Sequence, residues 1–75
     1  MKNIEALIAD GGSISVGALD EMECVAAASD VHNSLAMLVR RDGETLGALL
    51  KRLDKAVGQF YADGDVIDEV NSQSD

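Results

Sequence analysis

The apolar residues of segment 45–61 repeat at a helical spacing, and this stripe constrains the fold more than any other feature of the chain. Leu46, Leu50, Leu53, Val57 and Phe60 are separated by four, three, four and three residues. This spacing places them on one face of an α-helix, as in the seam of a coiled coil. The helix needs an apolar surface against which to bury that face.

Segment 20–41 is expected to provide this surface. It contains no proline or glycine, is rich in alanine, and carries acids in its first turn and arginines in its last, as the helix dipole favours. Asp42-Gly43-Glu44 predicts a short turn before the next helix, and helices joined so closely lie antiparallel. Apolar residues again recur every four and three positions: Cys24, Ala28, Val31, Leu35 and Leu38.

The flanking segments predict smaller elements. Ile4, Leu7 and Ile8 indicate a two-turn helix. Residues 13–19 alternate in polarity, but with no second strand foreseen they are interpreted as a connector. Thr45 is the expected N-cap of the second helix, and residues 66–70 predict one more helical turn.

The predicted fold is therefore all-α: an antiparallel helical hairpin with a short N-terminal helix and a possible short C-terminal helical turn, in a small bundle. Residues 1–70 would form a single helical domain, and residues 71–75 a disordered tail. A core of this size stabilises a fold only modestly, which favours self-association.

Composition limits the chemistry that we expect. Cys24 is the single cysteine and His32 the single histidine, so neither an intramolecular disulfide nor a zinc site with the usual ligands is expected. We predict no metal and no cofactor. The lone cysteine is typical of a reducing compartment, and no apolar run approaches the roughly 18 residues of a membrane span. These features predict a cytoplasmic protein that contacts no membrane.

The residues that could react lack the neighbours that catalysis requires. His32 has no evident nucleophile or orienting carboxylate, and acids surround Cys24 and disfavour its thiolate. The acidic stretch 63–69 departs from the calcium loop of an EF-hand, which needs acidic ligands where Ile67 and Ser74 stand. We therefore expect a protein that is not an enzyme.

Charge is distributed unevenly along the chain, whose net charge is −8. Residues 1–39 carry −5, residues 40–61 carry +2, and residues 62–75 carry −5. A negative field repels the phosphate backbone, so nucleic-acid binding is disfavoured and a basic partner is favoured.

The sequence thus predicts a non-enzymatic, small acidic protein–protein interaction module of adaptor or inhibitor type, acting as a homodimer on a partner with a basic or apolar surface. One alternative is a small helix-turn-helix-like DNA-binding regulator that uses the basic segment 51–55. Another is a phage- or mobile-element-encoded inhibitor of a nucleic-acid-binding protein, whose carboxylates would imitate phosphates. The predicted interface consists of Leu46, Leu49, Leu50, Leu53, Val57, Phe60 and Tyr61.

Overall fold

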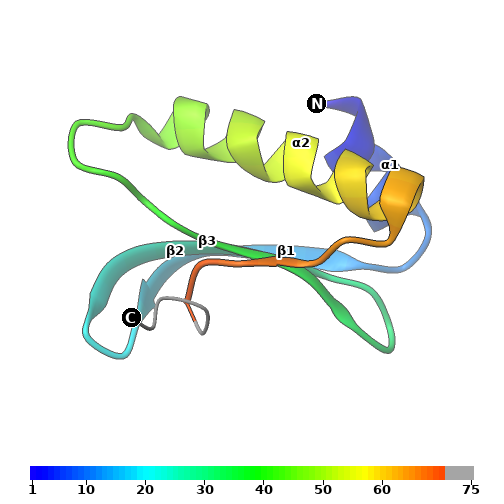
Figure 1. Cartoon of the computed structure of the whole chain (residues 1–75), viewed down its shortest axis with the longest axis horizontal. Coiled ribbons are helices and arrows are strands. Elements are labelled where there is room, and N and C mark those ends of the chain that lie inside the picture. The colour runs from blue at the N-terminus through cyan, green and yellow to red at the C-terminus, as the bar shows by residue number, and fades with distance from the viewer. Residues whose placement is uncertain (71–75) are drawn as a thin grey trace.

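The computed structural model describes residues 1–70 and shows a two-layer α/β fold, so the all-α prediction is wrong. Both helices lie on one face of a four-stranded sheet (Figure 1). The predicted tail at 71–75 lies outside the described residues. In chain order the elements are α1 (Lys2–Ala9), β1 (Ser13–Leu19), β2 (Met22–Ser29), β3 (Ser34–Val39), α2 (Leu46–Asp63) and β4 (Ile67–Asp68).

The sheet is mixed, and its strands lie in the order β1-β2-β3-β4. The first three strands form an antiparallel meander. The chain then crosses the sheet through α2 and returns as β4, which pairs in parallel with β3 at Ala36 and Met37 only. Helix α2 is thus the crossover connection that parallel pairing requires.

Helix α2 confirms the prediction made from segment 45–61. The Thr45 hydroxyl accepts a hydrogen bond from the Ala48 amide at 3.1 Å, as expected of an N-cap. The helix ends at Gly64, whose φ of 77° is in the left-handed region that glycine tolerates best. The short helix near the N-terminus is also confirmed, as α1.

The predicted helix over residues 20–41 is instead the β2–β3 hairpin. Alternate residues of β2 face the helices, as the period of two of a strand requires: Cys24, Ala26 and Ala28. The run of alanines obscures this period in the sequence, because alanine favours helices. The Asp30 carboxylate accepts hydrogen bonds from the amides of His32 and Asn33, at 2.8 and 2.6 Å, and so forms the turn of the hairpin. Asp30 and Asn33 are thus turn signals within the expected helix.

Two further corrections follow from this hairpin. Segment 13–19 is strand β1 rather than a connector, because β2 provides the partner that it lacked in the prediction. The expected helical turn over 66–70 instead contains β4. With three strands between the two helices in the chain, no helical hairpin exists within residues 1–70.

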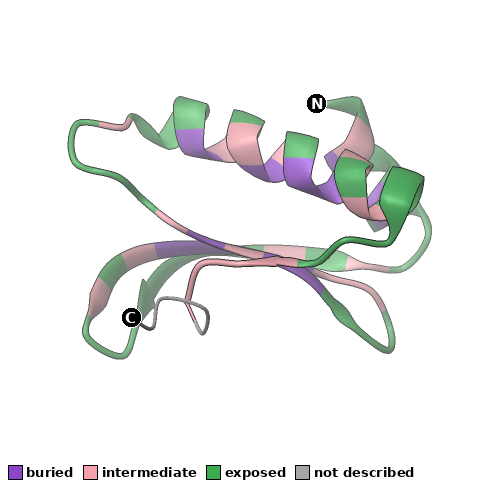
Figure 2. Ribbon diagram, viewed as in Figure 1, coloured by how far each residue is buried: buried purple, intermediate pink, exposed green. Residues whose placement is uncertain are grey.

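The core lies between α2 and the sheet, and Figure 2 shows burial concentrated on the side of α2 that faces the strands. Leu35 is the extra residue of a β-bulge, since Ala28 pairs with Ala36 whereas Ser29 pairs with Ser34. Neither helix within residues 1–70 is long and apolar enough to cross a membrane. The buried cluster consists of Ile4, Leu7, Ala26, Ala28, Leu35, Ala36, Leu38, Leu49, Leu53, Ala56 and Val57.

Helix α1 is fixed to α2 by a carboxylate that acts as a cap from a distant part of the chain. Met1 provides no side-chain cap. Asp54 of α2 instead accepts a hydrogen bond from the Ile4 amide at 2.9 Å, and the Asn3 side chain donates to the Asp54 carbonyl at 3.1 Å. Gly58 leaves room for Asn3, because a Cβ there would lie 2.5 Å from Asn3 Nδ2.

Gly12, between α1 and β1, should be intolerant of any side chain. A Cβ at this position would lie 2.4 Å from Leu7 Cδ1 and 2.8 Å from the Ser29 carbonyl oxygen. We expect Gly12→Ala to lower the free energy of unfolding by about 1–3 kcal/mol, as overpacking does. Gly47→Ala is the control, because a Cβ there meets nothing within 4 Å and alanine favours a helix by up to about 1 kcal/mol. Urea unfolding followed by circular dichroism measures both, and equal stabilities of the two variants would contradict this account.

Candidate interaction surface

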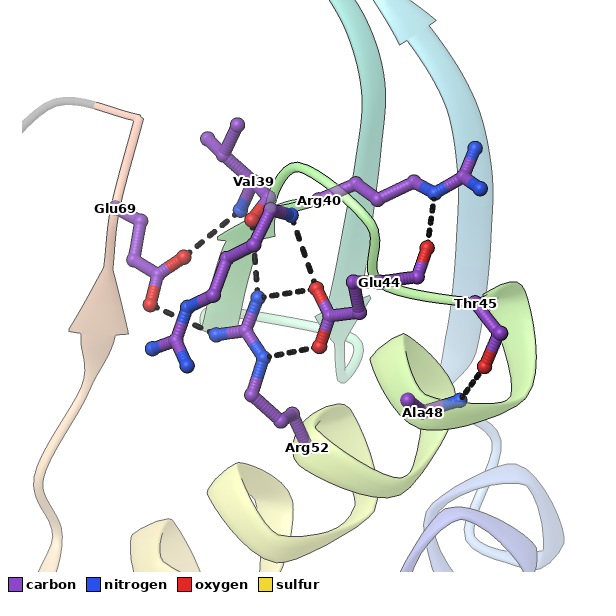
Figure 3. Close-up of polar contacts among 8 residues, drawn as sticks. Val39, Arg40, Glu44, Thr45, Ala48, Arg52 and Glu69 are labelled. Carbon is purple, nitrogen blue, oxygen red and sulfur yellow. Dashed lines mark hydrogen bonds and ion pairs between the residues drawn. The ribbon is translucent and has the colours of Figure 1, made fainter.

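The Arg52 guanidinium joins three parts of the chain at one edge of the sheet (Figure 3). Its Nε and one terminal nitrogen donate to the two oxygens of Glu44 at 2.8 and 2.9 Å. The other terminal nitrogen donates to Glu69 at 3.0 Å, and a further bond of 3.0 Å reaches the Val39 carbonyl. The Arg52 side chain is 22% exposed and that of Glu44 only 9%. This fork geometry is the one that suits arginine and not lysine.

This network also closes the outer edge of β3. The Glu69 amide donates to the Met37 carbonyl at 2.7 Å, and the Glu69 carboxylate accepts from the Val39 amide at 2.9 Å. Because Arg52 binds the Val39 carbonyl, side chains satisfy both backbone groups of Val39. Side chains thus cover the part of the β3 edge that the two residues of β4 do not reach.

The opposite edge of the sheet differs. Strand β1 has β2 as its single neighbour within residues 1–70. In an antiparallel strand, alternate residues direct their N–H and C=O groups away from the neighbour, so about half of β1 presents backbone groups outward. Of its seven residues only Ile14 is half-buried, and Val16 is 39% exposed. No charged residue occurs in β1, and charge is one means by which proteins protect an edge.

The sheet face opposite the helices adjoins this edge and is also uncovered by any helix of the described chain. Ser15, Ala27 and Met37 pair across three strands, as do Gly17, Val25 and Val39. A shallow hollow runs along β1 and includes Val25, Ala27 and Met37 in its floor. We define the candidate interaction surface as the outer edge of β1 together with this hollow.

The predicted interface residues of α2 do not form one exposed patch. Leu50 and Phe60 are half-buried and pack on the core. Leu46 and Tyr61 are 49% and 50% exposed, but they are fifteen positions apart, or about 22 Å along the helix. The remaining three are fully buried against the sheet: Leu49, Leu53 and Val57.

The other residues considered from the sequence are dispersed. His32 is exposed in the β2–β3 turn, and its amide helps to keep the pKa of Asp30 below the usual value. Cys24 is half-buried and borders a hollow that also contains Arg40 and Arg41. Within residues 1–70 no three His, Cys, Asp or Glu residues are placed to hold a metal.

The basic segment 51–55 does not belong to a helix-turn-helix, because a strand and not a helix precedes α2. Lys51 and Lys55 are exposed, whereas Arg52 binds Glu44 and Glu69. The sequence pattern placed arginines at the end of a helix over residues 20–41, and neither the β1 edge nor the Arg52 network was predicted from it. The charge-free alternation of Ser13–Leu19 was the available signal for the edge.

Comparison with protein-family models, with curated proteins and with solved structures finds no match.

The Arg52 network should make stability depend on acidic pH. Hydrogen bonding to Arg52, with a smaller contribution from the Arg41 amide, lowers the pKa of Glu44 from 4.5 to about 2. A carboxyl whose pKa is lowered by folding stabilises the protein fully above pH 4.5 and loses this effect as the pH falls towards 2. We expect the free energy of unfolding to decrease over that window, and to decrease less in Glu44→Gln. Glu21→Gln, at an exposed turn residue, controls for the loss of one charge; an unchanged pH profile in Glu44→Gln would contradict the prediction.

Proposed function

We propose that the chain is a non-enzymatic, cytoplasmic protein–protein interaction module that binds its partner through the outer edge of β1 and the adjoining hollow. The observation that carries this proposal is the difference between the two edges of the sheet. At one edge, β4, Glu69 and Arg52 satisfy the backbone groups of β3. At the other, an uncharged strand of seven residues has an outer side without a neighbouring strand among the described residues.

An open edge of this kind favours binding, because unpaired backbone groups and exposed apolar side chains both gain from contact with another chain. Val16 and Leu19, at 39% and 36% exposure, are large apolar side chains on β1 itself. They lie beside the hollow over Val25 and Ala27. Together these features offer backbone pairing and apolar contact at one place.

The net charge of −8 supports a partner with a basic surface, since complementary charge accelerates encounter and suppresses wrong partners. Whether the protein acts as an adaptor or as an inhibitor depends on that partner. The homodimer predicted from the sequence remains a proposal. Leu53 and Val57, at the centre of the interface predicted for that dimer, are buried within the chain and are not accessible to a second copy.

The proposal is tested by quantitative affinity capture from cells that express the chain naturally. The variant Val16→Lys places a charge on the β1 edge, whereas Val66→Lys makes the same change at a residue that is 52% exposed, just before β4. We expect a partner that is recovered with the wild type and with Val66→Lys but is depleted at least roughly tenfold with Val16→Lys, because a desolvated charge opposes edge pairing. Recovery of the same proteins in equal amounts with all three chains would contradict the proposal. Circular dichroism of both variants verifies that they are folded.

A further inference from the structure

Strand β1 is bordered at both ends by acids, although it carries no charge itself. Asp10 is exposed at the end of α1, three residues before the strand begins. Asp20 and Glu21 are exposed in the turn that follows it, and Glu23 is exposed on β2. The strand is about 23 Å long, which is more than twice the screening length at physiological salt, so its two ends act as separate negative sites.

The basic groups of the described chain are unevenly placed with respect to these acids. Lys2 is at the opposite end of α1 from β1. Arg40 and Arg41 follow β3 and line one hollow with Glu23, and the Arg40 side chain donates to the Glu44 carbonyl oxygen at 2.7 Å. Arg52 is engaged by Glu44 and Glu69. Glu23 therefore has arginines of its own chain beside it, and Asp10, Asp20 and Glu21 are the acids left to attract cations from outside the chain.

This pattern of charge also distinguishes between the occupants that an open edge can take. If β1 paired with β1 of a second copy in antiparallel fashion, Asp10 of each copy would lie near Asp20 and Glu21 of the other. In a parallel pairing, each acid would lie near its own counterpart. Both arrangements place like charges together at both ends, which destabilises strand pairing. The edge therefore disfavours a second copy.

The side chains of β1 leave room for another strand. Ser15 and Gly17 lie on the face away from the helices, and a Cβ at Gly17 would meet nothing within 4 Å. Val16 lies on the other face, in the row of Ala26, and is still 39% exposed. Alternate side chains of an added strand would thus contact a shallow apolar surface on one face and Val16 on the other.

We infer that β1 binds an extended segment of the partner protein as a fifth strand, and that this segment has an uncharged, alternating centre of about seven residues with lysine or arginine at both ends. The inference rests on the proposed function and adds the chemistry of the partner to it. Backbone pairing along β1 gives affinity, and the acids at the two ends select a segment with basic ends.

The experiment titrates the ¹⁵N-labelled protein with three synthetic peptides and follows amide shifts and hydrogen exchange by NMR. The first peptide has seven alternating threonines and valines between pairs of lysines. The second replaces the lysines with glutamates, and the third keeps the lysines but replaces two central residues with proline. We expect the first to shift the β1 amides and to slow exchange of those that point outward. The second peptide should bind roughly tenfold more weakly, because its end charges are reversed. The third should not slow the exchange of the β1 amides, because proline has no backbone N–H to donate.

The same variants serve as controls. Val16→Lys should abolish the slowed exchange caused by the first peptide, and Val66→Lys should preserve it. Equal shifts with the first and third peptides would show electrostatic contact without strand pairing and would overturn the inference. Slowed β1 exchange that appears with rising protein concentration and no peptide would assign the edge to a second copy, which also overturns it.

The two proposals fail in different ways. If none of the peptides affects β1 while affinity capture still depends on Val16, strand addition is wrong and the interaction module stands. If capture is independent of Val16 and the peptides leave β1 unchanged, both proposals are wrong.

Discussion

The interaction on which the described structure most depends is the one between Arg52 and its two carboxylates. Arg52 is on the crossover helix, Glu44 precedes that helix, and Glu69 follows β4. One guanidinium therefore fixes the start of α2, the end of β3 and the C-terminal part of the described chain. Its five N–H groups make this possible, since a lysine has three donors on one nitrogen and cannot hold both carboxylates in a planar fork.

This arrangement gives the sheet two unequal edges. The β4 pairing covers only two residues of β3, and the side chains of Glu69 and Arg52 complete it. At the β3 edge, charged side chains bind backbone groups that a longer β4 would otherwise pair. At the β1 edge, charged residues lie before and after the strand but not within it. The distribution of charge, rather than its net value, therefore distinguishes the two edges of the sheet.

Local sequence signals predicted the local parts of this structure. The spacing of Leu46 to Phe60 and the cap at Thr45 describe α2, because helices form from contacts within a few residues. The β2–β3 hairpin was missed because alanines fit both helix and strand, and because Cys24, Ala28 and Leu35 match a helical spacing by coincidence. The β1 edge was missed for the same reason, because β1 can be recognised as an edge strand only when its partner β2 is known to be a strand. The contacts of Arg52 with Glu69 and of Asp54 with Ile4 span 17 and 50 residues, and no local pattern announces them.

The parallel pairing of β4 has a consequence for synthesis of the chain. The meander β1-β2-β3 and helix α2 contact one another through residues among the first 63 of the chain. The outer edge of β3 is covered only when Glu69 has left the ribosome and the crossover has closed. During that interval a nascent chain exposes both sheet edges, and within the described residues the later segment closes the one beside β3. The residues that close this edge are thus made after those of every other element in the described chain.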